Sequence, residues 1–265
     1  MTVEIVSRAT GKVLDVPGGQ PMEGLGIQQF HDDGGTNQQW EVIPDGGAFR
    51  VTSVATGMVL TVPGADQGDP GDGVQIEQFL DHGGPSQRWQ FVSEPPGFFT
   101  IVSVATGRVL DVRDGLTNSD DGVPIQQFEG NGGANQQWQA IEVVPMLTGA
   151  EVTFHTNDDD KDGDTQLTVT LRQDSGLVAA RVSDNFGGFP NDSDNGPFAL
   201  LLENASAKNT LTGGSVVIRI DPQGHDTWRF NFTFDMTFSD GTHLFTAHDG
   251  VDLDQDGHEL TFPVT

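Results

Sequence analysis

Three copies of one short frame, a glutamine two residues before a tryptophan, organise the first half of the chain. They are Gln38-Gln39-Trp40, Gln87-Arg88-Trp89 and Gln136-Gln137-Trp138, and the tryptophans are 49 residues apart in both intervals. A period of this length indicates a repeated supersecondary unit. Because a single unit of this size cannot bury its apolar face alone, the three units must pack on one another. The sequence therefore predicts one pseudo-threefold domain over residues 1–144.

Each repeat presents the same short elements in the same order. A hairpin with glycine in its turn comes first, followed by a polar glycine-rich loop, a short apolar strand and a Gly-Gly turn before the Gln-x-Trp strand. Four strands in each of three repeats are the number needed for a closed six-stranded barrel capped by three hairpins. We expect the tryptophans to pack in the core and the first glutamine of each frame to clamp the backbone. The predicted hairpins span residues 3–16, 49–62 and 99–112, and the apolar strands span residues 27–30, 76–79 and 125–128.

The Gln-x-Trp frame, the Gly-x-Val-Leu-Asp-Val hairpin and the Ile-Gln-Gln-Phe strand together resemble ricin-type β-trefoil lectins, also called family 13 carbohydrate-binding modules. The resemblance covers residues 1–144. It implies a β-trefoil with a shallow sugar pocket in each repeat, and galactose-type sugars as ligands. In such a pocket an aspartate accepts hydrogen bonds from sugar hydroxyls and an aromatic ring stacks on the pyranose. A glutamine on the intervening strand and an asparagine before Gln-x-Trp complete the site.

The residues that the resemblance assigns to sugar binding are complete in two of the three repeats. In the first repeat they are Asp15, Gln28, Phe30 and Asn37, and in the third they are Asp111, Gln126, Phe128 and Asn135. The second repeat has Thr61, Glu77 and Ser86 at the three polar positions. We therefore expect two competent pockets and one degenerate pocket.

The chemistry of these residue types supports the same interpretation. A neutral sugar offers adjacent hydroxyls and one apolar face, which suit a carboxylate acceptor, amide groups and a flat ring. Asp15 and Asp111 end apolar strands, where a carboxylate has no packing role, so ligand contact is favoured over a solvated strand end. For Phe30 and Phe128 a structural role stays open beside stacking, because Phe79 occupies the same place in the degenerate repeat.

The repetition ends at Trp138, and residues 148–265 predict a second domain, an antiparallel β-sandwich, so that the whole chain is all-β. Strict alternation of Trp228, Phe230, Phe232 and Phe234 indicates a face buried against another sheet. The run of residues 224–228 resembles C2-like or lipoxygenase-homology sandwiches, without implying a function. The predicted strands are residues 151–156, 165–172, 177–183, 198–203, 215–220, 227–238, 243–247 and 259–264.

Two loops of the second domain, residues 158–163 and 252–257, both spell D-x-D-x-D-G. Alternate carboxylates followed by glycine wrap a hard cation, so we expect a structural calcium there. Neither loop has a glutamate at the twelfth position, and ordinary acidic turns are the alternative. Residues 191–196 are a weaker third version. The predicted calcium ligands are Asp158, Asp160, Asp162, Asp252, Asp254 and Asp256.

The charge of the chain excludes several classes of partner. The formal net charge of -27 repels phosphate backbones and anionic lipids, so nucleic acid is not an expected partner. No run approaches the ~20 apolar residues that span a bilayer, so we expect no membrane insertion. The absence of cysteine excludes disulfides and thiolate metal sites. No signal peptide is visible, because residues 2–7 already follow a strand pattern.

The sequence contains neither an H-E-x-x-H nor a G-x-S-x-G motif, and we expect a protein that is not an enzyme. Our prediction is a lectin that recognises galactose-type sugars through its first and third repeats, with a calcium-stabilised sandwich. One alternative is a targeting module of an enzyme or toxin, whose second domain gathers His225, His243 or His248 beside carboxylates. Another is a scaffold in which the trefoil has lost sugar binding.

Overall fold

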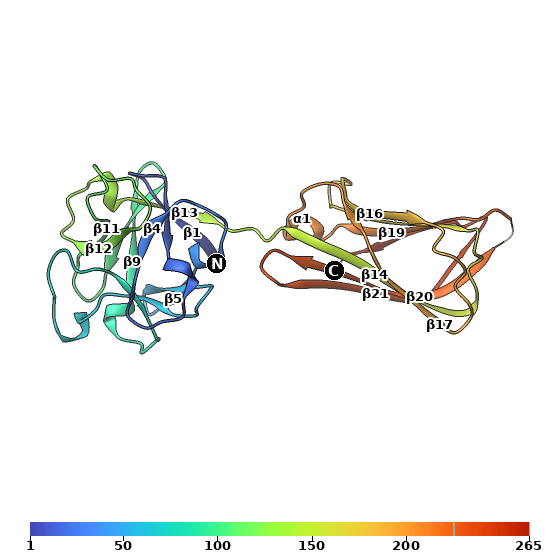
Figure 1. Ribbon diagram of the computed structural model, residues 1–265, viewed down its shortest axis with the longest axis horizontal. Helices are drawn as coiled ribbons and strands as arrows, with labels where there is room; N and C mark the ends of the chain where they lie inside the picture. Colours follow the sequence, from blue (N-terminus) through green and yellow to red (C-terminus); the bar gives the residue numbers. More distant parts are fainter. Residues whose placement is uncertain (225, 265) are drawn as a thin grey trace. The chain divides into compact units, whose positions relative to one another are not determined.

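The computed structural model describes residues 1–224 and 226–264, and it divides into two compact units, Met1–Val143 and Val144–Thr265 (Figure 1). Most of the regular structure in both units is β-strand. The α-helix α1 (Lys208–Leu211) spans four residues. In the described part of the chain, no helix combines the length and the apolar character that crossing a membrane requires.

Six strands of the first unit form a closed ring of antiparallel pairs. β1 pairs with β5, β5 with β6, β6 with β9, β9 with β10, β10 with β13, and β13 with β1 again. Closure leaves the barrel without an unpaired edge, and it confirms the predicted six-stranded barrel. The strands are β1 (Thr2–Ser7), β5 (Gln39–Asp45), β6 (Ala48–Ser53), β9 (Trp89–Glu94), β10 (Phe98–Ser103) and β13 (Trp138–Glu142).

Three further strand pairs cap the barrel, one from each repeat. They are β2 (Val13–Asp15) with β4 (Gln28–Phe30), β7 (Val59–Thr61) with β8 (Glu77–Phe79), and β11 (Val109–Val112) with β12 (Val123–Phe128). The caps also pair between repeats, because β12 joins β4, and β3 (Leu25–Gly26) joins β8. Each repeat therefore completes its neighbour, as the threefold packing requires.

The three repeat tryptophans lie in the barrel core, as predicted. Trp40, Trp89 and Trp138 are fully buried, and each indole N–H donates to a leucine carbonyl oxygen at 2.9 to 3.0 Å. A 3-10 helix precedes each of them, which the sequence had not indicated. These helices are η2 (Thr36–Gln38), η4 (Pro85–Gln87) and η5 (Ala134–Gln136), and two others are η1 (Pro17–Gly19) and η3 (Ala65–Gln67).

The first glutamine of each frame is a backbone clamp. The amide oxygen of Gln38 accepts from the Asp33 N–H at 2.9 Å, and its amide nitrogen donates to the His31 carbonyl at 2.8 Å. Gln87 and Gln136 make the same two bonds in their own repeats. The clamp closes the Gly-Gly turn onto the strand that follows, and it confirms the role predicted for these residues.

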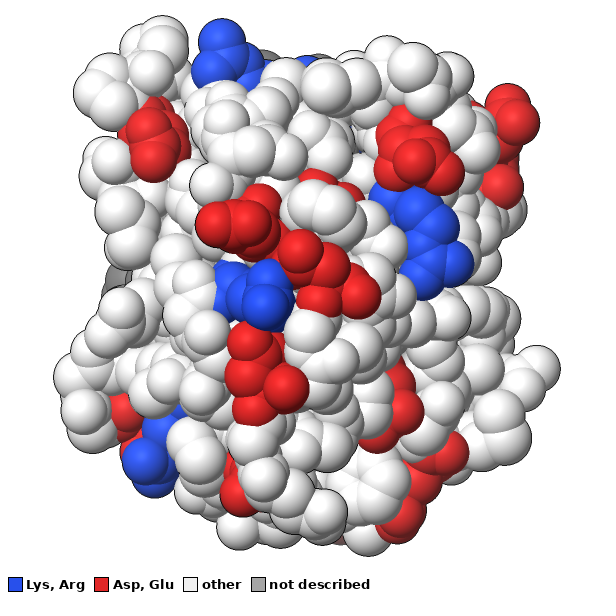
Figure 2. Space-filling model, turned by 90° about the vertical axis from the view of Figure 1, so that its left-hand side faces the viewer, with Lys and Arg blue, Asp and Glu red and all other residues white. Residues whose placement is uncertain are grey.

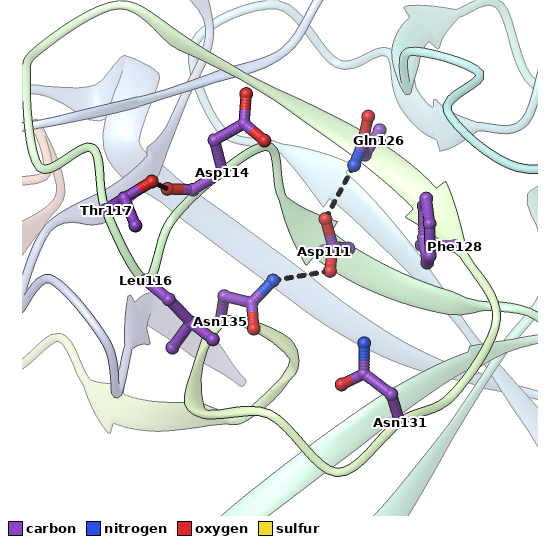
Figure 3. A pocket seen from close by; sticks show the side chains of 8 residues that line it. All are labelled: Asp111, Asp114, Leu116, Thr117, Gln126, Phe128, Asn131 and Asn135. Atoms are coloured by element: carbon purple, nitrogen blue, oxygen red, sulfur yellow. Dashed lines mark hydrogen bonds between the residues drawn. The ribbon is translucent and has the colours of Figure 1, made fainter.

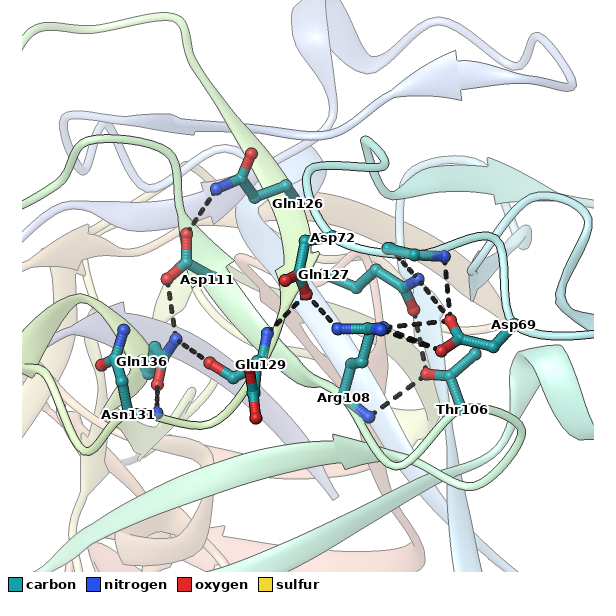
Figure 4. A network of polar contacts seen from close by, with 11 residues as sticks. Asp69, Asp72, Thr106, Arg108, Asp111, Gln126, Gln127, Glu129, Asn131 and Gln136 are labelled. Atoms are coloured by element: carbon teal, nitrogen blue, oxygen red, sulfur yellow. Dashed lines mark hydrogen bonds and ion pairs between the residues drawn. The ribbon is translucent and has the colours of Figure 1, made fainter.

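Ion pairs also join neighbouring repeats. Lys12 of the first repeat pairs with Asp121 of the third at 2.5 Å, and Arg108 of the third lies between Asp69 and Asp72 of the second (Figure 4). On the face of the first unit seen in Figure 2, several of the few basic side chains touch acidic ones. Two of the few basic side chains of this acidic chain, Lys12 and Arg108, are therefore used at contacts between repeats.

The second unit is a sandwich of two antiparallel sheets, as predicted. Its core holds the alternating aromatic residues of β20, because Trp228, Phe230, Phe232 and Phe234 are at most 2% exposed. One sheet has the order β17 (Ser193–Ala199), β14 (Leu147–Asp159), β20 (Thr227–Phe238) and β21 (His243–Asp254). The other has the order β18 (Leu201–Leu202), β16 (Val178–Asp184), β15 (Gln166–Arg172), β19 (Ser215–Asp221) and β22 (Glu259–Pro263).

The predicted single strand over residues 198–203 is divided between two strands in the structure. The chain changes sheet there, with β17 in one sheet, β18 in the other and buried Leu200 between them. The run of residues 191–196, interpreted as a weak cation loop, contributes instead to β17, where Asp194 pairs with His155 of β14. Asp, Asn and Gly have low strand propensity, so this pairing depends on the neighbouring strand rather than on local preference.

Candidate functional site

A pocket of about 310 Å³ opens in the third repeat (Figure 3). It brings together all four residues predicted from that repeat, which come from the end of β11, from β12 and from η5. Four more residues of the wall were not predicted. The lining residues are Asp111, Asp114, Leu116, Thr117, Gln126, Phe128, Asn131 and Asn135.

The Asp111 carboxylate is the polar centre of this pocket. Its oxygens accept from the side-chain amides of Gln126 at 2.8 Å, Asn135 at 2.7 Å and Gln136 at 3.1 Å. The residue is only 2% exposed, and this burial raises the pKa of Asp111 although the amide donors oppose the rise. The negative charges of Asp114 and Asp72 raise this pKa further. The carboxylate is thus held in one orientation by donors from three directions.

The first repeat has the same arrangement around Asp15. Its carboxylate accepts from Gln28 at 2.7 Å, Asn37 at 2.7 Å and Gln38 at 3.2 Å. Burial again raises the pKa of Asp15, and the charge of Asp33 adds to the rise. The structure therefore brings the predicted polar residues of this repeat together. The last donor, the glutamine of the Gln-x-Trp frame, was predicted only as a backbone clamp.

The aromatic residues of the two repeats lie in different surroundings. Phe128 forms one wall of the third-repeat pocket, and Leu116 stands on the other side of Asp111 (Figure 3). In the first repeat the ring of Phe30 lies against the imidazole of His31, with ring centroids 4.5 Å apart. A sugar in the third repeat would therefore meet apolar surface on two sides.

The amide of Asn135 contains an unused acceptor. Asn135 is 8% exposed, and within the described residues its Oδ1 atom has no hydrogen-bond partner. A buried acceptor left without a donor costs about 1–3 kcal/mol, and such atoms are uncommon in folded proteins. A hydroxyl donor from a bound ligand is one way to satisfy it.

The second repeat has a pocket of about 180 Å³ with a different polar set. Thr61 stands in place of the aspartate, and its hydroxyl oxygen accepts from Gln87 at 3.1 Å. The carboxylate is supplied by Asp66, which accepts from the N–H and the hydroxyl of Ser86 at 3.0 and 2.7 Å. Burial raises the pKa of Glu77, which lines the same pocket. Only the first and third repeats therefore share the aspartate and amide arrangement.

The two Asp-rich runs of the sandwich begin in strands rather than in loops, because Asp158 lies in β14 and Asp252 in β21. Between them on β20, the guanidinium of Arg229 lies 3.7 Å from Asp158 and 3.1 Å from Asp252. Asp254 accepts from the backbone N–H groups of Asp256 and Gly257, as in an acidic turn. Among the residues that the structure describes, no group of three or more His, Asp or Glu side chains is placed to hold a metal ion. Calcium stays a prediction from the sequence.

Lys161, in the middle of the first Asp-rich loop, is fully buried. Its ammonium lies 4.9 Å from the centroid of the Phe189 ring. The ammonium, with three N–H donors, lies 2.8 to 2.9 Å from four backbone carbonyl oxygens that share them, those of Asp162, Thr165, Asn185 and Gly187. Carbonyl oxygens that would suit a bound metal ion are thus already occupied by a cation of the chain itself.

The histidines considered as components of an active site have separate partners. His243 lies 2.9 Å from Asp235 at the edge of the sandwich, and the ring of His248 packs on Phe232 and Phe262. His225 lies outside the described residues. The second unit therefore presents these side chains in surface and packing contacts rather than in one described cluster.

The first unit is a closed trefoil barrel, and two of its repeats contain a carboxylate, amides and an aromatic ring. These features together define a domain of the lectin type. The family model of ricin-type β-trefoil lectin domain-like proteins matches residues 1–79 and 85–169, which is more than half of the chain. The chain therefore belongs to the ricin-type β-trefoil lectin domain-like family. No curated protein matches this chain in sequence.

Several solved structures are similar to this chain. A designed threefold-symmetric protein, ThreeFoil, is 30% identical with a TM-score of 0.51, over 54% of this chain and 99% of its own. An exo-β-1,3-galactanase from Clostridium thermocellum is 33% identical with a TM-score of 0.50, over 54% of this chain and 30% of the galactanase. A mosquitocidal holotoxin matches 98% of this chain and 40% of its own, at 14% identity and a TM-score of 0.50, which is a similarity of fold alone.

Proposed function

We propose that this protein binds glycans with terminal galactose-type sugars through the pockets of its first and third repeats. The observation that carries the proposal is the buried carboxylate of Asp111, oriented by amide donors beside the ring of Phe128. A sugar hydroxyl donates to such a carboxylate, and the apolar face of the pyranose packs on the ring. The same polar arrangement around Asp15 supports a second site.

The class of sugar is supported by the comparisons. The chain belongs to a lectin-like family, and one of the similar structures is that of an exo-β-1,3-galactanase. Among the residues that line the third-repeat pocket there is no histidine, cysteine or lysine. The Asp111 carboxylate is held by three amide donors, an arrangement that suits accepting hydrogen bonds from a bound hydroxyl.

Each pocket should bind a single sugar weakly. A shallow site with a few hydrogen bonds and one ring contact corresponds to a dissociation constant near millimolar, or about 4 kcal/mol. Two sites on one trefoil gain apparent affinity for glycans that engage both at once. We therefore expect much tighter binding to multivalent surfaces than to free galactose.

Isothermal titration calorimetry with galactose and lactose tests the proposal. We expect the unaltered protein to show two sites, Asp15→Ala and Asp111→Ala to show one each, and the double variant to show none. Thr61→Ala is the matched control, because Thr61 occupies the same position in the second repeat, and it should leave the binding unchanged. Circular dichroism confirms that each variant is folded. Full binding by the folded double variant would refute the assignment of the sites.

A further inference from the structure

Asp114, in the wall of the third-repeat pocket, has an unusual backbone conformation. Its φ is 54°, in the left-handed region, and the equivalent residues of the other repeats are the glycines Gly18 at 59° and Gly64 at 77°. The equivalence follows from the hairpins, because each of the three residues comes two positions after a buried valine. Aspartate is one of the few residues other than glycine that adopt this conformation, because its short polar side chain can hydrogen-bond locally. An unusual backbone conformation at a pocket motivates a functional hypothesis for the side chain.

The surrounding turn holds Asp114 in this conformation. Its carbonyl oxygen accepts from the backbone N–H groups of Thr117 and Asn118, both at 2.8 Å. Its carboxylate accepts no hydrogen bond from the residues that the structure describes, and it lines the pocket beside Asp111 (Figure 3). The negative charge of Asp114 contributes to the raised pKa of Asp111. The third-repeat pocket therefore has a second acceptor that the protein itself leaves free.

Two further features of the same pocket suit a ligand that has both hydroxyl donors and apolar surface. The buried Oδ1 atom of Asn135 lacks a partner among the described residues. Leu116, two residues after Asp114, is 67% exposed on the side of the pocket opposite Phe128. At this position the first repeat has Gln20, so the apolar rim, like the second carboxylate, belongs to the third repeat.

We infer that Asp114 determines the specificity of the third-repeat pocket, accepting a second hydroxyl of a neutral sugar and excluding sugars that carry an acidic group. The inference rests on the proposed function and adds a difference between its two sites. The first-repeat site has Gly18 at this position, and the other carboxylate whose charge acts on its Asp15, that of Asp33, already accepts a hydrogen bond from the Gly35 N–H. The third pocket therefore binds a neutral galactose-type sugar more tightly than the first, and it discriminates more strongly against an anionic one.

The test uses the Asp15→Ala protein, in which the third pocket is the remaining galactose site. Adding Asp114→Gly should weaken galactose binding about tenfold, the effect of losing a hydrogen bond to a charged acceptor. It should also reduce the preference for galactose over galactose 6-sulfate. Asp114→Asn keeps an accepting oxygen and tolerates the left-handed conformation, so it should keep part of the affinity but lose the discrimination. Thermal melting separates binding from folding, because glycine at this φ should not lower the melting temperature.

The reciprocal exchange provides a matched gain of function. Gly18→Asp, made in the Asp111→Ala protein, should give the first pocket higher affinity for galactose and a stronger preference against galactose 6-sulfate. The position has room, since a Cβ atom on Gly18 would meet no atom closer than 3.7 Å. Unchanged affinity and discrimination in the Asp114→Gly protein would overturn this inference alone. If the Asp15→Ala protein binds no sugar of a broad glycan panel, the proposed function is overturned together with it.

Discussion

Asn135 donates a 2.7 Å hydrogen bond to the carboxylate of Asp111, and Asn37 makes the same bond to Asp15 at the same length. In both of these repeats the asparagine comes from the 3-10 helix before the buried tryptophan, and the aspartate is the last residue of β2 or the last but one of β11. The bond therefore ties the pocket to the barrel core. It makes the pocket a part of the folded structure before any sugar is bound.

Asn135→Ala should destabilise the first unit by about 1–3 kcal/mol, because it removes a donor from a buried carboxylate. Urea unfolding measures the change. Asn209→Ala in the exposed part of α1 is the control, since the structure shows no hydrogen bond of its side chain, and it should cost less than about 0.5 kcal/mol. Equal unfolding midpoints for the two variants would contradict the structural role of the bond.

As the pH is lowered, sugar binding should weaken, and the midpoint of this loss should lie above 3.8, the ordinary pKa of an aspartate. Burial raises the pKa of both Asp15 and Asp111, and a protonated carboxyl loses acceptor capacity. The contribution of these two carboxyl groups to the free energy of unfolding changes with pH in the opposite direction to sugar binding. Between 3.8 and the raised value the folded state binds more protons than the unfolded state, so their contribution falls as pH rises through that window. Calorimetry from about pH 3.5 to 7 measures the midpoint of binding, and a midpoint below 3.8 would contradict the prediction.

Asp121 should contribute stability that persists into strong acid. The hydrogen bonds from Lys12 and His31 lower its pKa to about 2. A carboxylate with a lowered pKa stabilises the folded state above its unfolded value of 3.8, and the contribution is lost as pH falls through about 2. Asp121→Asn should therefore make the loss of stability between these two values shallower. Asp120→Asn removes the same charge at the neighbouring position and is the control for the change in net charge. Equal slopes of the pH profile in the two variants would contradict the assignment.

Lys161→Met should destabilise the sandwich by about 2–4 kcal/mol, because four buried carbonyl oxygens lose their common donor. Lys208→Met provides the control, since the Lys208 ammonium has a single hydrogen bond, to the Thr242 hydroxyl, at an exposed site. Guanidinium unfolding should separate the two variants clearly. A midpoint of Lys161→Met that equals that of the control would show that the buried ammonium is dispensable.

Removal of calcium by a chelator should leave the melting temperature unchanged. The Asp-rich loops already contact two cations of the chain, the ammonium of Lys161 and the guanidinium of Arg229. Thermal melts with chelator, with calcium and with magnesium measure the effect. An increase of several degrees that is specific to calcium would support the calcium site predicted from the sequence instead.

The trefoil could be predicted from the sequence in detail. The 49-residue period, the hairpins and the Gln-x-Trp frame are short-range patterns, and each has a single structural explanation when repeated in phase. The buried positions of Trp40, Trp89 and Trp138 and the clamp of Gln38 were expected for this reason. In the sandwich the alternation of β20 was equally clear, because a period of two is itself the signature of a half-buried strand.

The third-repeat pocket was predicted only in part. Asp114 and Leu116 lie in a loop whose sequence differs among the repeats, so comparison of the repeats gave no reason to select them. The left-handed backbone of Asp114 arises from the turn that closes on Thr117 and Asn118. An aspartate in place of Gly18 and Gly64 is visible in the sequence, but its meaning depends on a dihedral angle.

Patterns along the chain alone determined the repeat, the barrel, the sandwich and the two aspartates that end cap strands, because periodicity and strand ends are local properties. Tertiary packing decided the rest. It placed the ammonium of Lys161 among the carbonyl oxygens of Asn185 and Gly187, more than twenty residues away along the chain, and it placed Arg229 of β20 between Asp158 of β14 and Asp252 of β21. A carboxylate-rich segment binds a metal ion or a side-chain cation according to which distant residues pack beside it in the fold. No local sequence pattern contains that information.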